Sequence, residues 1–239
     1  MKKVLLLTFV SVFILAGCQE KEYVYSCNDE VNSQVLENLE EITNLTRSEW
    51  LKMEEGEYRM ASFRAFTPKQ RHTFLTAKIN ETLSFGWSKL ERQHILKLQQ
   101  FINDNPAILN PGWEKDQDLH DTYDVFQYKW LEYAKEVLSW DDKLIYAVAF
   151  SPEEMKSKEG DLGIILFSDP NEDTAPDDGE GGDLPRCWCH TNFEYCKMGD
   201  PAMWFAYCKE GECKGTSLGC QLLLLGSCNG TCVTYSIVH

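Results

Sequence analysis

The stretch CWCHTNFEYCKMGDPAMWFAYCKEGECKGTSLGCQLLLLGSCNGTC, residues 187–232, decides the fold prediction for this chain. It holds eight of the ten cysteines, and residues 28–186 hold none. A short segment with so many cysteines can be held by crosslinks, whereas a long cysteine-free stretch must be held by packing. We therefore predict two structural parts with different sources of stability. The eight cysteines are Cys187, Cys189, Cys196, Cys208, Cys213, Cys220, Cys228 and Cys232.

The N-terminus has the composition of an export signal that ends in a lipobox. Lys2 and Lys3 precede an apolar run from Val4 to Ala16, which closes on Gly17-Cys18. A basic head, a short apolar run and small residues before the cut are typical of a secretory signal. We predict cleavage of residues 1–17 and acylation of Cys18 by fatty acyl chains such as palmitate. An ordinary secretory signal with an incidental cysteine is the alternative.

The lipobox also predicts where the protein resides. The apolar run is too short to cross a bilayer as a helix, but several acyl chains on one cysteine anchor a protein stably. We expect residues 18–27 to form an anchor segment that binds the membrane through lipid. The predicted location is the cell envelope, at the outer membrane.

The clustered cysteines could serve as crosslinks or as metal ligands. Cys187, Cys189, His190 and Cys196 have the residue types and close spacing of a tetrahedral zinc site. An exported chain meets oxidising conditions, however, and thiols pair there. We therefore predict four disulfides in a module spanning residues 187–239, with no metal site. The sequence leaves the disulfide pairing open.

An acidic linker precedes this module. Residues 169–186 hold seven acidic residues, three prolines and three glycines, with a single leucine. Such a segment buries too little apolar surface to offset the loss of backbone entropy. We predict that it is disordered and that proteases cut it first. A calcium site is the alternative interpretation, although the ordered spacing of a calcium loop is missing from this sequence.

The cysteine-free part, residues 28–168, is predicted to be mainly helical. Apolar residues recur at helical spacing between positions 31 and 42. Capping boxes at Thr67–Gln70 and Ser88–Glu91 predict two helix starts, and Asn105-Pro106 predicts the end of the second helix. A further helix is expected after Pro111-Gly112, where apolar residues repeat by four and three. That stripe consists of Leu119, Tyr123, Phe126, Trp130, Tyr133 and Val137.

Two apolar runs near the end of this part predict strands. Leu144–Phe150 and Leu162–Phe167 are continuous apolar runs, and Ser151–Glu154 between them has the composition of a helix start. We predict two buried strands around a short helix. The predicted fold class is α+β, with a mainly helical N-terminal domain that includes a small strand pair, followed by a small disulfide-rich C-terminal module.

Composition and motifs argue against nucleic-acid binding and catalysis. The net charge of -15 disfavours phosphate backbones, because binding them needs clustered cations. The sequence has no metalloprotease, serine-hydrolase or phosphate-loop motif, so we predict no enzyme, no catalytic residue and no cofactor. His94, between Leu90 and Leu98 on an apolar face, is predicted to be a hydrogen-bonded core histidine. His120 is predicted to be solvated, and the sequence identifies no partner for His72.

The cysteine pattern resembles that of a known family. It is similar to the fulvocin C-related lipoproteins of Bacteroidetes-type bacteria, whose namesake is a small cysteine-rich bacteriocin. Phe66–Arg71, with Gln93, also resembles the helical part of that family. The matching features are Cys187-x-Cys189, Cys196 seven residues later, Gly219-Cys220 and Cys228-Asn229-Gly230.

This resemblance has two departures. The gap from Cys196 to Cys208 is long, and the final spacing from Cys228 to Cys232 is wider than in the peptide. The resemblance implies a bacteriocin-like peptide module, although a shared cysteine frame carries fold more directly than activity.

Three functions follow from these observations. In the first, the helical domain carries a bacteriocin-like antibacterial effector, either released or displayed, that acts on a target-cell membrane or receptor. The run Gln221–Gly226 and the aromatic residues Trp188, Trp204 and Phe205 could enter that membrane, or the leucines could form a buried strand between cysteines. In the second, the chain is a cell-surface binding lipoprotein without toxic activity. In the third, it is an envelope enzyme with no recognised motif.

Overall fold

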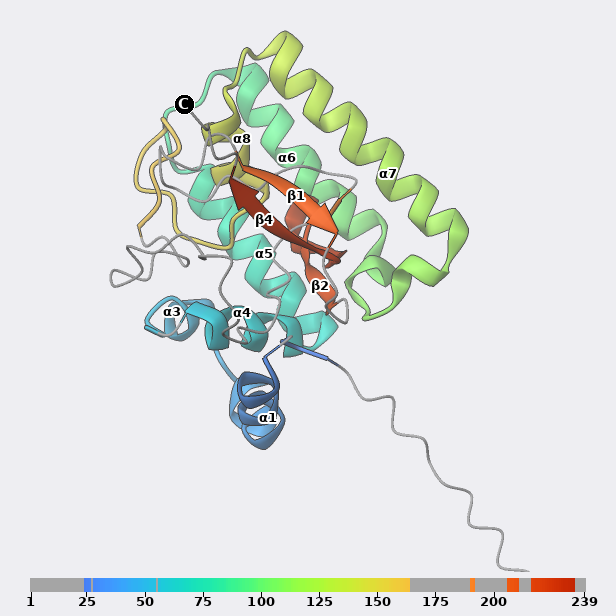
Figure 1. The fold of residues 1–239 in the computed structure, drawn as a ribbon. Coiled ribbons are helices and arrows are strands. Elements are labelled where there is room, and N and C mark those ends of the chain that lie inside the picture. The colour runs from blue at the N-terminus through green and yellow to red at the C-terminus, as the bar shows by residue number, and fades with distance from the viewer. Residues whose placement is uncertain are drawn as a thin grey trace, which may run out of the picture.

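The computed structural model describes residues 24–26, 28–54, 56–163, 190–191, 206–210 and 216–234 (Figure 1). The predicted signal, the linker at 169–186 and all five cysteines before residue 208, Cys18 included, lie outside these ranges. The described chain is mainly helical with small antiparallel strand pairs. The predicted α+β class is therefore confirmed.

Eight α-helices form the larger part of the described chain. A π-helical turn, Tyr133–Val137, extends the seventh, and 3-10 turns at Pro106–Leu109 (η1) and Trp113–Lys115 (η2) connect the sixth to the seventh. In chain order the helices are α1 Asp29–Glu37, α2 Leu39–Ile42, α3 Arg47–Trp50, α4 Gly56–Ala65, α5 Pro68–Thr82, α6 Lys89–Asp104, α7 Gln117–Glu132 and α8 Asp142–Ala149.

The predicted helix boundaries are largely confirmed. Thr67 and Gln70 form a capping box at the start of α5, and Ser88 and Glu91 form one at the start of α6. Helix α6 ends at Asp104, directly before Asn105-Pro106. Beyond Pro111-Gly112 the chain first makes the turn η2, and α7 begins only after Asp116, whose side chain accepts a hydrogen bond from the backbone of Leu119.

The core is built from aromatic and aliphatic side chains of these helices. Trp50, Phe63, Phe66 and Phe74 are almost fully buried, and their rings contact one another at centroid distances of 5.0–6.4 Å. Such edge-on and tilted ring pairs are favourable beyond their buried area. Helices α3, α4 and α5 are thereby fixed around one aromatic cluster.

The prediction of two strands near residue 150 is wrong for the residues that the structure describes. Residues 144–149 belong to helix α8, whose start is capped by the Asp141 side chain, since a short apolar run fits a buried helix as well as a strand. Residues 151–154 start no helix. Of the second run, only Leu162 and Gly163 are described, and Leu162 makes an isolated bridge to Met155.

The strands lie instead in the cysteine-rich segment. Strand β1, Ala206–Glu210, pairs antiparallel with β4, Gly230–Thr234, so that Cys208 lies opposite Cys232. Strand β2, Thr216–Cys220, pairs antiparallel with β3, Gly226–Cys228. The α+β class is therefore right, but its described strand pairs come from the cysteine-rich segment.

Candidate functional site: a docked disulfide loop

Residues 216–228 form a crosslinked hairpin, which we call the disulfide loop. In it Thr216 lies opposite Cys228, and Cys220 lies opposite Gly226. A disulfide joins Cys220 to Cys228, with their Cα atoms 5.3 Å apart. The prediction of disulfide bonding in this module is thereby confirmed for this pair, and Cys208 is disulfide-bonded too.

Most of the other cysteines of the module fall outside the part of the chain that the structure describes. Cys187, Cys189, Cys196 and Cys213 lie outside the described residues, as does the side chain of Cys232. The zinc alternative falls on the same cysteines. Among the residues that are described, no group of three or more histidine, cysteine, aspartate or glutamate side chains could hold a metal ion.

The tip of the disulfide loop is a turn made of leucines. Leu222, Leu223, Leu224 and Leu225 are almost fully buried, and the first three form a 3-10 turn. Burial of each leucine is worth roughly 1.5–3 kcal/mol. The run is therefore buried, as one of our two interpretations expected, but as a turn and not as a strand. In this structure the leucines pack in the hydrophobic core of the chain.

This turn has an unusual backbone. Gln221, Leu223 and Leu224 have φ angles of 63°, 58° and 59°, in the left-handed region that side-chain-bearing residues rarely adopt. Each such residue costs roughly 1–3 kcal/mol and persists only where the surroundings enforce it. The crosslink between Cys220 and Cys228, together with the burial of the leucines, supplies that constraint.

Side chains of the helical part bind the backbone of the disulfide loop. The Tyr123 hydroxyl donates to the Leu222 carbonyl at 2.7 Å, and the Leu222 amide donates to Oε1 of Gln127 at 2.8 Å. The Trp113 indole donates to the Leu225 carbonyl at 2.7 Å. Burial raises the pKa of the Tyr123 phenol well above its ordinary value, with Glu114 adding to the effect, so the hydroxyl remains a donor.

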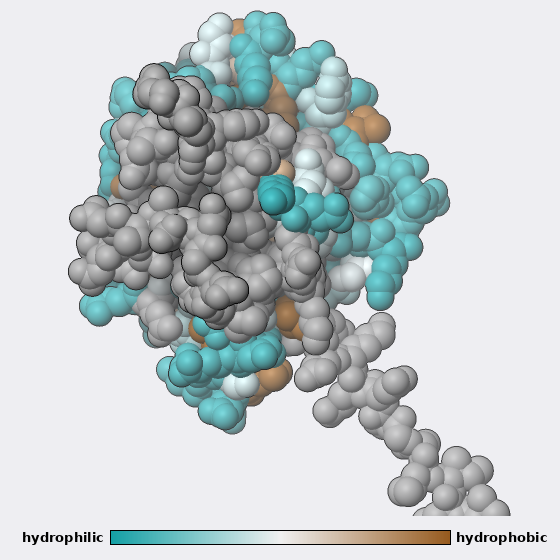
Figure 2. All heavy atoms as spheres, viewed as in Figure 1, coloured by the Kyte–Doolittle hydropathy of each residue, from teal (hydrophilic) through white to brown (hydrophobic). Residues whose placement is uncertain are grey.

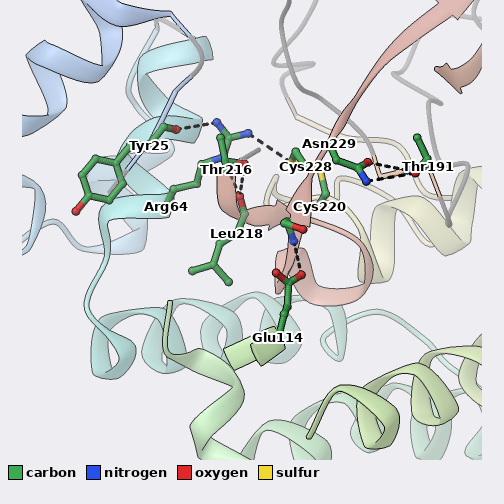
Figure 3. The surroundings of a disulfide bond; sticks show 10 residues. Tyr25, Arg64, Glu114, Thr191, Thr216, Leu218, Cys220, Cys228 and Asn229 are labelled. Atoms are coloured by element: carbon green, nitrogen blue, oxygen red, sulfur yellow. Dashed lines mark hydrogen bonds between the residues drawn. A yellow bond between two sulfur atoms is a disulfide. The ribbon is translucent and has the colours of Figure 1, made fainter. Parts of the chain in front are cut away.

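Arg64 contacts the opposite end of the loop (Figure 3). From α4, its guanidinium donates to the carbonyls of Leu218 at 3.0 Å and Tyr25 at 2.9 Å, and Nη2 lies 3.7 Å from Sγ of Cys228. A Cβ at Gly219, where φ is 113°, would lie 2.5 Å from Nε of Arg64. Position 219 therefore requires glycine, because the Arg64 guanidinium packs directly against its Cα.

One hydrophobic core contains both parts of the described chain. The leucines at positions 218 and 222–225 belong to the same buried cluster as the helices. The sequence suggested that crosslinks hold the module while packing holds the helices, but the disulfide loop is held by both. We call Arg64, Trp113, Tyr123 and Gln127 the helical clamp, because these side chains hold the backbone of the loop.

Sequence reasoning missed most of the helical clamp. Tyr123 lay in the predicted stripe of α7, and Gln127 follows it by four residues, so a polar residue on a buried face was the available signal. No sequence pattern indicated a role for Trp113 or Arg64. Their contacts span 112 and 154 residues of sequence, and local patterns carry no information at that range.

Strands β1 and β4 form a two-stranded ribbon, which we call the outer ribbon. Lys209 and Glu210 on β1 are exposed, whereas Cys208 is buried. Next to the ribbon, the backbone amide of Thr191 donates to the Asn229 side chain at 2.9 Å. Figure 2 shows that apolar residues on the described part of this face form small separate spots among hydrophilic ones.

The three histidines of the helical part lie in different environments. His94 is buried as predicted, but the expectation that it is hydrogen-bonded is wrong, since neither ring nitrogen has a partner. Its ring stacks on Trp130 at 4.5 Å and on Tyr133 at 4.9 Å. His120 is half-buried and lies 3.5 Å from Asp124. His72 contacts the Asn103 side chain at 2.8 Å.

Replacement of His94 by phenylalanine is expected to protect the fold against acid. Burial, with Lys97 nearby, lowers the pKa of His94 from 6.5 to about 4. The unfolded chain therefore binds the proton first, so stability is complete above pH 6.5 and is lost as the pH falls toward 4. In urea unfolding, the wild-type protein should lose on the order of 3 kcal/mol of stability between these pH values, and His94→Phe should not show this loss. His120→Phe, at a half-buried site on the surface of α7, is the control and should keep the wild-type acid sensitivity. An unchanged acid dependence in His94→Phe would contradict the assignment.

A cluster of buried charges ties residues 152–153 to the helices. Nη2 of Arg59 lies 2.7 Å from Oε1 of Glu153, and the two side chains are 1% and 4% exposed. Nζ of Lys78 donates to the Glu153 carbonyl. Arg47 binds the Pro152 carbonyl and makes an ion pair with Glu81 at 2.8 Å.

The charged groups in this cluster have shifted pKa values. Burial lowers the pKa of Lys78 to about 7, with Arg47 adding to the effect. Burial raises the pKa of Glu153 to about 7, against the pull of Arg59, Arg47 and Lys78. Such shifts often mark active sites. Here the groups bond to one another and to carbonyls in the interior, so we interpret the cluster as a structural crosslink.

No family model, curated protein or solved structure matches this chain. Within the described ranges, none of the helices is both long enough and apolar enough to cross a bilayer. The candidate site is therefore defined by geometry alone: the disulfide loop, the helical clamp and the outer ribbon.

Proposed function

We propose that the chain is a lipid-anchored envelope protein that binds a partner at the cell surface and, while its disulfides are intact, keeps its disulfide-rich segment as a fixed part of the fold. The observation that supports this proposal is the leucine turn, which packs into the helical core with its backbone held by Tyr123, Gln127 and Trp113. A segment whose apolar side chains are part of the protein core is held in one position, and it can present its exposed strands to a partner in a constant geometry. The outer ribbon, with Lys209 and Glu210 exposed, is the binding element that we propose.

A second candidate is a bacteriocin-like effector held in a latent state. It is supported by the cysteine frame and by the position of the leucines, which a membrane-active segment would need to expose and which are buried in the common core. In this case the segment acts only after it leaves the core. The two candidates therefore differ in whether the disulfide loop can separate from the helices while the Cys220–Cys228 disulfide is intact.

Cleavage of the chain between its two parts distinguishes the candidates. A protease site placed within residues 169–186 of the full chain is cut under native, oxidising conditions, and a non-reducing denaturing gel establishes that no disulfide joins the halves. Under the binding proposal, the halves co-elute and neither inhibits related bacteria nor releases dye from them. Separation of the halves, with dye release by the smaller one, would reject the binding proposal in favour of the effector.

Partner binding is tested on intact cells. A photo-crosslinking residue at Lys209 is expected to give a discrete adduct that the same residue at Glu40, exposed on α2, does not give. A Gly230→Trp variant, which enlarges a buried position on the paired strand, should abolish the adduct. Equal labelling at the two positions would argue against a partner at the ribbon.

The membrane anchor gives a separate prediction. Cys18→Ala should leave an exported protein that takes up no labelled fatty acid and no longer partitions into detergent, because the thiol is the predicted acylation site. Cys27→Ala is the matched control and should label as the parent chain does. Continued incorporation of label into Cys18→Ala would overturn the lipobox assignment.

A further inference from the structure

The guanidinium of Arg64 lies against one sulfur of the Cys220–Cys228 disulfide. Its Nη2 atom is 3.7 Å from Sγ of Cys228, inside the protein. The side chain is fixed there by the Leu218 and Tyr25 carbonyls and by the passage under Gly219. A cation beside a sulfur stabilises the thiolate over the thiol and makes that sulfur the better leaving group.

We propose that the Cys220–Cys228 disulfide is a reducible latch, a thiol–disulfide exchange site for a dithiol reductant, and that Arg64 directs the exchange by holding Cys228 as the leaving thiolate. The sulfur that is attacked is that of Cys220, the more exposed residue of the pair at 4%. Cys228 is fully buried beside the guanidinium. The co-reactant is a dithiol, and it becomes an intramolecular disulfide.

The exchange proceeds in two displacements. A thiolate of the reductant attacks Sγ of Cys220, the Cys220–Cys228 bond breaks, and Cys228 leaves with the electron pair as a thiolate beside Arg64. The second thiol of the reductant then loses its proton and attacks the reductant's sulfur in the mixed disulfide. Cys220 leaves and takes up that proton. The dithiol is oxidised by two electrons, and the protein disulfide is reduced to one thiol and one thiolate.

The latch controls the leucine turn because the crosslink helps to enforce its backbone. Gln221, Leu223 and Leu224 hold left-handed φ angles within the segment that the disulfide closes. Once the bond is cut, relaxation of these residues favours opening. Reduction is therefore expected to withdraw the leucines from the helical core and to expose them.

The first test compares the reduction of the full-length protein and its variants. Oxidised protein is equilibrated with graded dithiothreitol at pH 7.5, quenched with acid and alkylated, and the Cys220 and Cys228 peptides are quantified by mass spectrometry. In Arg64→Met, the equilibrium constant for reduction should fall roughly threefold to tenfold, and Arg64→Lys should restore most of it. Tyr123→Phe is the control, because it removes one clamp hydrogen bond and leaves the guanidinium in place.

The sign of the change separates the proposal from general loosening. A merely structural Arg64 predicts easier reduction in Arg64→Met, as in any variant that loosens the loop, whereas a thiolate-stabilising Arg64 predicts harder reduction. In Cys220→Ser, ultraviolet titration should find the Cys228 thiol with a pKa below the roughly 8.5 of free cysteine, and Arg64→Met should raise it. Unchanged or easier reduction in Arg64→Met, or an unshifted Cys228, would overturn the exchange site.

The opening step has its own readout. Hydrogen exchange of the amides at 222–225 should speed up at least tenfold when Cys220 and Cys228 are reduced, or are replaced together by serine. Binding of a hydrophobic dye should rise with it. If these amides stay protected while peptide mapping shows both cysteines reduced, the disulfide is not a latch.

Discussion

A chain shortened to residues 18–186 is expected to lose the cooperative unfolding transition that the full-length protein shows. The shortening removes five buried leucines, at 218 and 222–225, from the common core. At roughly 1.5–3 kcal/mol each, they contribute about as much as the whole stability of an ordinary domain, roughly 5–15 kcal/mol. It also leaves Trp113, Tyr123 and Gln127 without the loop groups that they bind.

The measurement is urea unfolding followed by tryptophan fluorescence and by circular dichroism. The full chain cut within residues 169–186 is the matched control, because it keeps the loop and loses only the connection. It should retain a cooperative transition, while the shortened chain should bind a hydrophobic dye and unfold gradually. A point variant reports the same effect in smaller measure, since Leu222→Ala should lose roughly 2–5 kcal/mol. A shortened chain with an unchanged midpoint and slope would show that the helices fold without the loop.

Local features of the fold could be predicted from the sequence because their causes are local. The capping boxes at Thr67 and Ser88 involve residues three apart, and the proline at 106 acts on its immediate neighbour. The apolar run at 144–150 predicts a strand but lies mostly in helix α8, because length and hydrophobicity alone do not distinguish a buried strand from a short buried helix.

The candidate site lay beyond local reasoning. The cysteine count correctly indicated disulfide bonding, but it assigned crosslinks and packing to separate parts of the chain. The leucine turn belongs to both, because its burial partners come from helices about a hundred residues away. The prediction that His94 is hydrogen-bonded is wrong for a related reason. Its spacing placed it in the core, but only the surrounding rings of Trp130 and Tyr133 show that its nitrogens lack partners.

The second large effect is expected at the buried ion pair between Arg59 and Glu153. Arg59→Met removes the closest cation from a carboxylate that is 4% exposed. Breaking a buried pair on one side typically loses 3–5 kcal/mol, because the remaining charge is neither solvated nor neutralised. We expect a loss of about 4 kcal/mol in urea unfolding at pH 8, above the pKa of about 7 to which burial raises Glu153.

The pH dependence of this loss identifies its cause. In Arg59→Met the carboxylate loses a cation that lowers its pKa, so Glu153 should take up a proton at a still higher pH than in the wild type. The variant should therefore recover part of its stability as the pH falls from 8 to 5.5, where a neutral carboxyl no longer needs a counter-charge. The double variant Arg59→Met/Glu153→Leu should lose less stability than Arg59→Met alone at pH 8 and show no such recovery.

Lys135→Met is the control. It breaks an ion pair at the surface, in which the Lys135 side chain is 47% exposed and its partner Asp142 is 33% exposed, and it should change stability by no more than about 1 kcal/mol. An Arg59→Met loss that does not vary with pH would instead indicate that the side chain acts through its packing on Trp50, over which its guanidinium lies at 4.9 Å.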